Sequence, residues 1–234
     1  MSIELNCKDG YNIEIEKKED RINILLVENE AFGERILVGA EERKEFLTPW
    51  INMLMHHKKE AGIKADVIED GMTFEENAMI KATEIAKIAH EMPEYAHAVV
   101  LADDSGLEID YLNKEPGIYS ARYMGEDTSY HIKNAKLIER LEGVPDEKRT
   151  ARFVCAIAAA FPDGTMKTVR AAMEGRIGYK ESGENGFGYD PIFYLPEYQC
   201  YSAELSLEEK NELSHRGKAL RLMKERLHES FNCQ

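Results

Sequence analysis

The sequence predicts an α/β fold in which helices flank a mixed β-sheet and two lobes enclose a cleft. Strand-like and helix-like patterns alternate through the first 141 residues, and two long strand-like segments follow them. The 234 residues, 43% of them hydrophobic, suffice for one large domain or for two lobes with a shared core. Charged residues make up 32% of the chain, which is typical of a globular protein.

The first 35 residues are predicted to be rich in β-structure. Apolar and polar residues alternate over residues 3–7 and again over 11–15, and Lys8-Asp9-Gly10 supplies a turn between them. This pattern predicts a β-hairpin. Ile22–Val27 is a candidate for a third strand.

A helix is predicted from residue 41 to about residue 59, after a short apolar run at residues 35–38. Phe46, Trp50 and Leu54 lie four residues apart and form an apolar stripe along one side of this segment.

A strand, a helix and a second strand are predicted next. Residues 64–68 have a strand pattern, and Thr73 with Glu76 forms the capping-box pattern that begins a helix ending near residue 90. Residues 98–102 form a continuous apolar run of strand length, which indicates burial on both faces.

The second half of the chain is predicted to contain longer strands than the first half. We predict a helix over residues 130–141, strands over 149–161 and 168–179 joined by a turn at 162–164, a glycine-rich loop over 183–188, and one final helix over 206–231. Ser206 and Glu209 form a second capping box at the start of that helix.

Composition excludes several classes of protein. The formal net charge of −14 argues against a protein that binds a nucleic acid polymer, since such binding rests on many Lys and Arg contacts to phosphate. No run approaches the length of a membrane span, and the N-terminus lacks the pattern of a signal peptide. The four cysteines lie far apart, which favours reduced thiols and a cytoplasmic location. They are Cys7, Cys155, Cys200 and Cys233.

The acidic segment at residues 101–107 is the first candidate for chemistry. Asp103 and Asp104 follow directly on the buried strand, and side chains at the end of a parallel strand face the crevice where α/β proteins bind ligands. Adjacent side chains on an extended chain face opposite ways, so one Asp can bind a metal while the other braces a neighbouring element. Carboxylates suit Mg²⁺ and can accept a proton from water. The alternative for this segment is a solvated Asp-Asp-Ser-Gly turn. Glu69, also just past a predicted strand, is a second candidate oxygen ligand, and its alternative is a surface acid.

The start of the helix at Thr73 is a second candidate, because free N–H groups at a helix N-terminus attract phosphate. Asn77 and Lys81 lie four residues apart on one face and border an alanine-lined stripe. The alternative is an ordinary capping box.

Two segments near the C-terminus could hold a ligand with a base and phosphates. The loop over residues 183–190 contains glycines that allow close approach, and Phe187 and Tyr189 can stack on a base while Asp190 accepts hydrogen bonds from it. The alternative is a hairpin turn with exposed aromatic residues. The run 210–216 places Lys210, Ser214, His215 and Arg216 together, where cations can clamp phosphate or a base carbonyl. Its alternative is a solvated helix face.

Five elements in this order resemble the inosine triphosphate pyrophosphatase family over residues 36–230. They are residues 73–82 (TFEENAMIKA), 101–112 (LADDSGLEIDYL), 116–123 (PGIYSARY), 186–193 (GFGYDPIF) and 214–219 (SHRGKA).

The resemblance implies an elongated α/β fold with two lobes around a central nucleotide cleft, usually as a homodimer. It implies cleavage of noncanonical purine nucleoside triphosphates (ITP, dITP and XTP) into monophosphate and pyrophosphate, with preference for a 6-oxo purine. By this likeness Asp104 is the proton acceptor and, with Glu69, a ligand of Mg²⁺. The implied substrate-binding residues are Lys44, Ser105, Phe187, Gly188, Tyr189, Asp190, Lys210, His215 and Arg216.

The sequence departs from the family in two places. The family's T/S-x-N-x-x-K phosphate loop corresponds here to Gly39-Ala-Glu-Glu-Arg-Lys44, so Gly39 replaces a hydroxyl residue and Glu41 replaces Asn, while Lys44 keeps its spacing. Residues 1–35 form an N-terminal extension before the pyrophosphatase domain, which we place at 36–234. Two alternatives follow from these departures: the same chemistry on another modified nucleotide, or a nucleotide-binding relative without activity.

Overall fold

The computed structural model describes residues 3–6, 12–15, 22–27, 53–57 and 61–232, with side chains for residues 61–230. Seven strands form one mixed sheet in the order β4-β3-β5-β6-β7-β8-β9. β3 runs parallel to β4 and β5, and the remaining pairs are antiparallel. The strands are β3 (Ile22–Val27), β4 (Met53–His57), β5 (Val99–Ile109), β6 (Thr150–Ala160), β7 (Met166–Ile177), β8 (Phe193–Leu195) and β9 (Cys200–Tyr201). This mixed sheet agrees with the predicted fold class.

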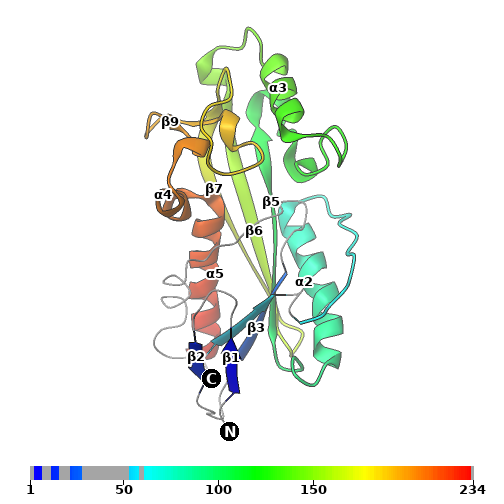
Figure 1. Ribbon diagram of the computed structural model, residues 1–234. Helices are drawn as coiled ribbons and strands as arrows, with labels where there is room; N and C mark the ends of the chain where they lie inside the picture. The colour runs from blue at the N-terminus through cyan, green and yellow to red at the C-terminus, as the bar shows by residue number, and fades with distance from the viewer. Residues whose placement is uncertain (1–2, 7–11, 16–21, 28–52, 58–60, 233–234) are drawn as a thin grey trace.

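The molecule is long and narrow, with α2 (Phe74–Glu91) and α5 (His215–Asn232) beside the central strands (Figure 1). Alternate residues of β5 and β6 face opposite sides. One side packs on α2 through small side chains such as Ala102 and Ala156, and the other packs on Ala219 and Met223 of α5. On the α2 side the contact is made largely by alanines, which are small enough to let the backbones of helix and sheet approach each other.

A separate core occupies the other end of the sheet, where α3 (Tyr130–Arg140) and α4 (Leu207–Leu213) lie. It gathers Leu107, Leu137 and Phe193 from three different elements. Short 3-10 helices connect this end: η2 (Asp110–Leu112), η3 (Gly117–Tyr119), η4 (Asp146–Lys148), η5 (Asp190–Ile192) and η6 (Ser202–Glu204). Two core regions along one elongated sheet correspond to the two predicted lobes.

The N-terminal hairpin is confirmed, because β1 (Ile3–Asn6) pairs antiparallel with β2 (Asn12–Ile15). The third predicted strand is also confirmed as β3. It pairs with β5, so a strand of the predicted N-terminal extension shares the sheet of the main domain. The division of the chain after residue 35 stays a prediction.

Several helices follow their sequence patterns. Thr73 Oγ1 accepts a hydrogen bond from Glu76 N at 3.1 Å, although the Glu76 carboxylate bonds to the backbone N–H of Met72 instead of closing the box on Thr73. The second capping box, between Ser206 and Glu209, is complete. The predicted helix at 130–141 and the two long strands of the second half are confirmed as α3, β6 and β7.

Two predictions between residues 41 and 68 are wrong. The segment predicted as a helix over 41–59 contains a strand instead, because Met53–His57 pairs along β3. Residues 41–52 and 58–60 lie outside the described part of the chain. Residues 64–68 form no strand. Their alternation is real, since Ala65 and Val67 pack on the α2 core, yet alternation indicates a buried face and not a hydrogen-bonded neighbour.

Two boundaries also differ from prediction. The strand predicted for residues 98–102 continues to Ile109, so the acidic segment belongs to β5 and is not a turn after it. The final helix predicted over 206–231 is divided into α4 and α5 at Ser214, whose backbone is extended. Ser214 Oγ accepts the N–H of Gly217 at 3.0 Å and so caps α5 as a new helix.

Candidate active site

The two adjacent carboxylates lie directly beyond the end of β3. The pairing of β3 with β5 ends at Val27 opposite Ala102, whereas β6 continues along the other edge of β5 past Asp104. The site therefore lies at the step where the parallel part of the sheet stops. Figure 1 shows that β5 extends well beyond β3 at this point.

Asp104 faces α2 and is held there by two side chains of that helix. Asn77 Nδ2 donates to Asp104 Oδ2 at 3.1 Å, and Lys81 Nζ lies 3.5 Å from Asp104 Oδ1. The same ammonium lies 3.2 Å from Glu69 Oε2. Burial raises the pKa of Asp104 to about 6, against the opposing influence of Lys81 and Asn77.

Asn77 and Lys81, singled out in the sequence as part of the second candidate, are not among the site residues that the family resemblance implies, yet the structure brings both to Asp104. The signal was present, because they are the two polar residues four apart beside the alanine stripe of α2. Asn77 also accepts the backbone N–H of Gly71 at 2.9 Å, and a Cβ at Gly71 would lie 2.7 Å from the same oxygen. Asn77 thus fixes the loop that bears Glu69 against the helix that holds Asp104.

Asp103 faces the opposite side of the sheet, as extended backbone requires. Its Oδ2 accepts hydrogen bonds from Ser105 Oγ and from an Arg216 guanidinium N–H, both at 3.0 Å. Burial alone would raise the pKa of Asp103, but the charges of Arg216 and Lys81 and these hydrogen bonds lower it below its ordinary value. Neighbouring carboxylates therefore have pKa values shifted in opposite directions.

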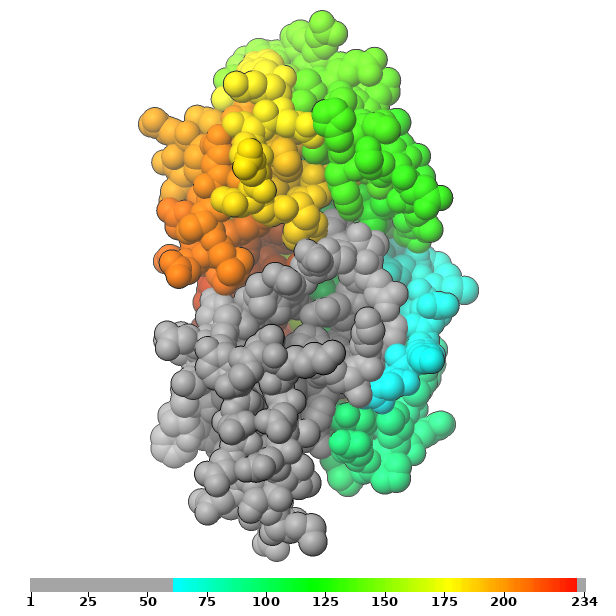
Figure 2. Space-filling view, in the orientation of Figure 1, coloured from blue at the N-terminus to red at the C-terminus, as the bar shows by residue number. Residues whose placement is uncertain are grey.

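The glycine-rich loop after β7 is folded around a buried carboxylate. Asp190 Oδ2 accepts the backbone N–H of Phe187 at 2.9 Å and pairs with Lys210 Nζ, while its Oδ1 accepts Ser202 Oγ at 2.8 Å. Figure 2 shows this yellow-to-orange part of the chain beside the green segment that contains α3. Gly188 O accepts Asn134 Nδ2 of α3 at 3.2 Å, which joins the two segments.

The structure separates the two aromatic residues of this loop. Phe187 is 39% exposed, and Lys210 Nζ lies 5.7 Å from its ring centroid, so the ring can stack on a base. Tyr189 is 1% exposed, packs edge-on against Tyr130, and donates its hydroxyl to Ser120 O at 2.7 Å. Base stacking by Tyr189 is thus a wrong expectation: the ring belongs to the core because the turn at η5 directs it inward.

His215 opens α5 beside these residues. Its ring stacks on Phe153 with centroids 5.1 Å apart, and burial lowers its pKa to about 3, with the charges of Arg216 and Lys210 acting in the same direction. The histidine is therefore neutral near pH 7. Its Nδ1 is buried and has no hydrogen-bond partner among the residues whose side chains are described.

Within the described part of the chain, the predicted site residues other than Gly188, Tyr189 and His215 lie around three carboxylates, those of Asp104, Asp103 and Asp190. Asp104 and Glu69 converge on Lys81; Ser105 and Arg216 bind Asp103; Phe187 and Lys210 bind Asp190. Lys44, Gly39 and Glu41 lie outside the described residues.

The oxygen atoms of Glu69 and Asp104 fit a divalent cation in part. Both carboxylates approach one ammonium, so their charges converge on one place. The described residues contain no group of three or more His, Cys, Asp or Glu side chains suited to a metal. Two carboxylates are nevertheless a typical protein contribution for Mg²⁺, whose other ligands are waters and substrate phosphates.

A family model described as the Ham1 family matches residues 40–226, most of the chain. The chain belongs to the Ham1 family. This Ham1 chain is 47% identical over 187 residues to the dITP/XTP pyrophosphatase of Clostridium perfringens, covering 80% of this chain and 91% of that relative. It is 52% identical over 153 residues to the dITP/XTP pyrophosphatase of Exiguobacterium sibiricum, covering 65% of this chain and 74% of that relative.

Solved Ham1 structures have the same fold. The Staphylococcus aureus Ham1 protein superposes with a TM-score of 0.73 at 37% identity, covering 89% of this chain and 99% of that one. A HAM1 protein from Coxiella burnetii superposes with a TM-score of 0.72 at 34% identity, again covering 89% of this chain and 99% of that one. These matches confirm the family resemblance and the predicted fold class. No helix among the described residues is long and apolar enough to cross a membrane.

Proposed function

We propose that this Ham1 protein hydrolyses noncanonical purine nucleoside triphosphates (ITP, dITP and XTP) to the monophosphate and pyrophosphate. Similar proteins from two bacteria are named dITP/XTP pyrophosphatase, and this chain covers most of their length. Asp104 and Glu69 offer carboxylates for the phosphate end, Phe187 and Lys210 offer groups for a base, and Arg216 links the last helix to the acidic segment of β5, which supports a nucleotide as the ligand.

The observation on which the proposal rests is the placement of Asp104. This buried carboxylate lies past the end of β3, and both its oxygens are oriented by donors on α2. A fixed carboxylate of this kind can accept a proton from an attacking water. Its pKa of about 6 leaves it mostly ionised at neutral pH and close to the range in which a general base is most effective.

Glu69 and Asp104 are the residues that would hold Mg²⁺, and Lys81 would remain beside them. When bound, the cation would supply positive charge to the phosphate tail of the substrate. Lys81 contributes a further positive charge at the same place, because it is buried between the two carboxylates.

The base would be bound at the other end of the site. Phe187 offers an exposed aromatic face, and Lys210 and Arg216 are held in place by Asp190 and Asp103. The neutral His215 can exchange hydrogen bonds with a base without adding charge. Cationic donors favour the carbonyl oxygen of a 6-oxo purine over the amino group of adenine.

We also propose that the protein acts in the cytoplasm as a homodimer. The four scattered cysteines support a reducing compartment, and the family resemblance supports the dimer. Light scattering coupled to size-exclusion chromatography measures the mass directly, and a monomer at micromolar concentration would contradict the dimer.

A substrate screen tests the enzymatic proposal. Purified protein with Mg²⁺ is incubated with ITP, dITP, XTP and the four common triphosphates, and pyrophosphate and phosphate are measured separately. We expect pyrophosphate without phosphate, with kcat/KM highest for the 6-oxo purines. Release of single phosphate, or no cleavage of any triphosphate, would overturn the proposal. Binding of the monophosphate without cleavage would instead identify a binding protein, and preference for a modified pyrimidine would change only the substrate.

A further inference from the structure

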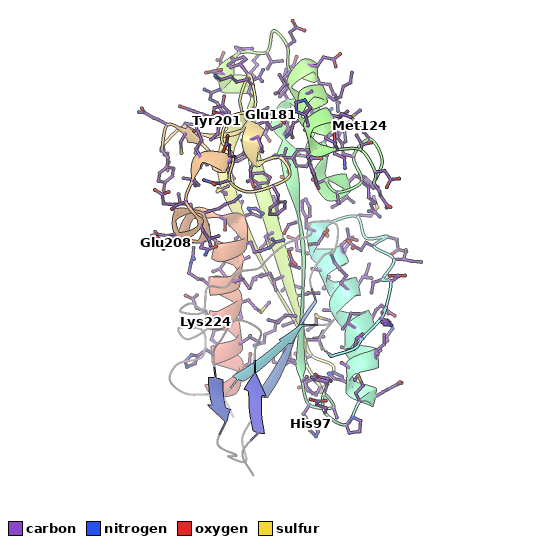
Figure 3. All side chains as sticks on the ribbon, in the orientation of Figure 1. His97, Met124, Glu181, Tyr201, Glu208 and Lys224 are labelled. Atoms are coloured by element: carbon purple, nitrogen blue, oxygen red, sulfur yellow. The ribbon has the colours of Figure 1, made fainter. Side chains whose placement is uncertain are left out.

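A buried serine that no predicted site includes lies next to the glycine-rich loop. Ser202 begins η6, directly after Tyr201, which Figure 3 labels at the end of the molecule opposite His97. Ser202 is 0% exposed, and its hydroxyl donates to Asp190 Oδ1 at 2.8 Å. A hydroxyl buried this completely is stabilised only through such a bond.

Asp190 distributes its two oxygens between different partners. Oδ2 accepts the Phe187 N–H and pairs with Lys210, while Oδ1 accepts Ser202. Ser202 is the donor to Oδ1 among the described residues, so its hydroxyl fixes the rotation of the carboxylate about its last bond. Without that donor, the buried Oδ1 would compete with Oδ2 for Phe187 and Lys210.

Both groups held by Asp190 Oδ2 belong to the base-binding end of the site. Lys210 Nζ lies over the Phe187 ring, and the backbone of Phe187 is tied to the same oxygen. Gly186, at φ +85°, allows the loop to approach this closely, since a Cβ there would lie 2.5 Å from Asp190 Oδ2. A small rotation of the Asp190 carboxylate would thus move the ammonium and the stacking ring together.

We propose that Ser202 is a positioning residue for base recognition, acting through Asp190 on Lys210 and Phe187. This inference rests on the proposed function and goes beyond it by naming a buried residue that positions the base-binding side chains and so sets the selectivity for the base. The proton-accepting Asp104 is held by a different element, α2, so loss of the Ser202 hydroxyl affects binding of the base more than the chemical step.

The chain offers a matched control in Ser182. Its hydroxyl donates to Glu204 Oε1 at 2.6 Å, so it bonds to the same 3-10 helix that Ser202 begins, but in an exposed position and to a carboxylate other than Asp190. Ser182→Ala removes an equal group from the same region. Any effect seen only with Ser202→Ala is then due to the bond to Asp190.

Steady-state kinetics with ITP and ATP test the proposal in the full chain with Mg²⁺. We expect Ser202→Ala to raise KM for ITP about tenfold, the usual consequence of an unpaired buried acceptor, with kcat within about twofold of wild type. The ratio of kcat/KM for ITP to that for ATP should fall. Ser202→Thr, which keeps the hydroxyl, should restore the ratio, and Ser182→Ala should resemble wild type.

Other results would overturn the inference. Equal KM and selectivity for Ser202→Ala and Ser182→Ala would show that the bond to Asp190 does not position the pocket. A fall in kcat with unchanged KM and selectivity would also contradict it. If Ser202→Ala does not fold, Ser202→Cys replaces it, since a thiol keeps the shape but donates weakly. A wild-type protein that cleaves no triphosphate would instead contradict the proposed function, and that result is seen before any variant is compared.

Discussion

The ammonium of Lys81 lies 3.5 Å from Asp104 Oδ1, and each side chain is only 4% exposed. The same ammonium reaches Glu69 Oε2 at 3.2 Å. One buried cation on α2 is therefore shared by both carboxylates proposed to hold a metal. Because Lys81 and Asn77 lie one turn apart on the same helix, α2 both orients Asp104 and places a positive charge beside it.

Replacing Lys81 should destabilise the fold. Lys81→Met leaves Asp104 buried with one hydrogen-bond donor and no compensating cation, and breaking such pairs costs about 3–5 kcal/mol. Urea unfolding monitored by circular dichroism measures the loss. The double variant Lys81→Met/Asp104→Asn tests the cause: the Lys81→Met loss should be smaller in the Asp104→Asn background by about 1 kcal/mol or more. Equal losses in both backgrounds would show that the two side chains are not coupled.

Asp104→Asn should remove activity without unfolding the protein. The amide cannot accept a proton from water, and loss of a general base lowers turnover by a factor of about 10²–10⁴. The neutral side chain also removes the cost of burying a charge, which offsets the weaker bonds to Lys81 and Asn77. Pyrophosphate release gives the activity, and the urea midpoint reports the fold. Turnover within tenfold of wild type would exclude Asp104 as the proton acceptor.

Gly217→Ala should destabilise the protein although it lies in a helix. Alanine usually stabilises a helix by about 1 kcal/mol relative to glycine. Here a Cβ would overlap the carbonyl oxygen of Asn211, because the chain turns back on itself between α4 and α5. We expect a net loss of about 1–3 kcal/mol, as for other overpacked sites, together with a raised KM because Lys210 and Arg216 flank this turn.

Lys218→Ala is the matched control for Gly217→Ala, since the neighbouring Lys218 is exposed on the same helix. It should leave the free energy of unfolding within about 0.5 kcal/mol of wild type. A Gly217→Ala protein that is more stable than wild type would show that the helices can separate at no cost.

His215 should make stability depend on pH. Its pKa is about 3 in the folded protein and near 6.5 when unfolded, so the unfolded chain binds more protons between these values. The stabilisation is complete above pH 6.5 and is lost as pH falls towards 3. Each unit of pKa difference between the folded and unfolded states changes the free energy of unfolding by about 1.4 kcal/mol. Arg216, Lys210, Asp103 and Lys218 contribute the charges around the ring.

His215→Gln removes this titration while keeping a polar side chain. Thermal unfolding of both proteins at pH 4.5, 5.5, 6.5 and 7.5 isolates the contribution, because Asp104 and the other titrating groups are present in each. The fall in Tm from pH 6.5 to 4.5 should be smaller in the variant. The same fall in both proteins would mean that the His215 pKa is not depressed.

Local signals were sufficient for much of the secondary structure. The caps at Thr73 and Ser206 and the alternation in β1 and β2 involve residues within four positions of one another, so each pattern is complete in the sequence. The predictions at Met53–His57 and residues 64–68 were wrong because an apolar stripe or an alternating face does not identify the partner against which it packs.

The candidate site shows the same limit. Asp103 and Asp104 were predicted to face opposite ways, and the strand geometry of β5 places them so. The pairing of Asn77 and Lys81 with Asp104 joins residues 27 and 23 positions apart and depends on how α2 lies on the sheet. The burial of Tyr189 likewise depends on its contact with Tyr130 of α3, which lies more than fifty positions earlier in the chain.

The acidic segment, the aromatic loop and the Ser-His-Arg run were identifiable in the sequence, because residue type and spacing determine which groups can bind a metal, a base or phosphate. The family followed from their order. Only the tertiary structure decided which carboxylate receives which cation: Asp104 faces Lys81, Asp103 faces Arg216, and Asp190 faces Lys210 and Ser202. These pairings arise from the packing of α2, α4 and α5 around one sheet. In that packing burial raises the pKa of Asp104, while Arg216 and Lys81 lower the pKa of Asp103.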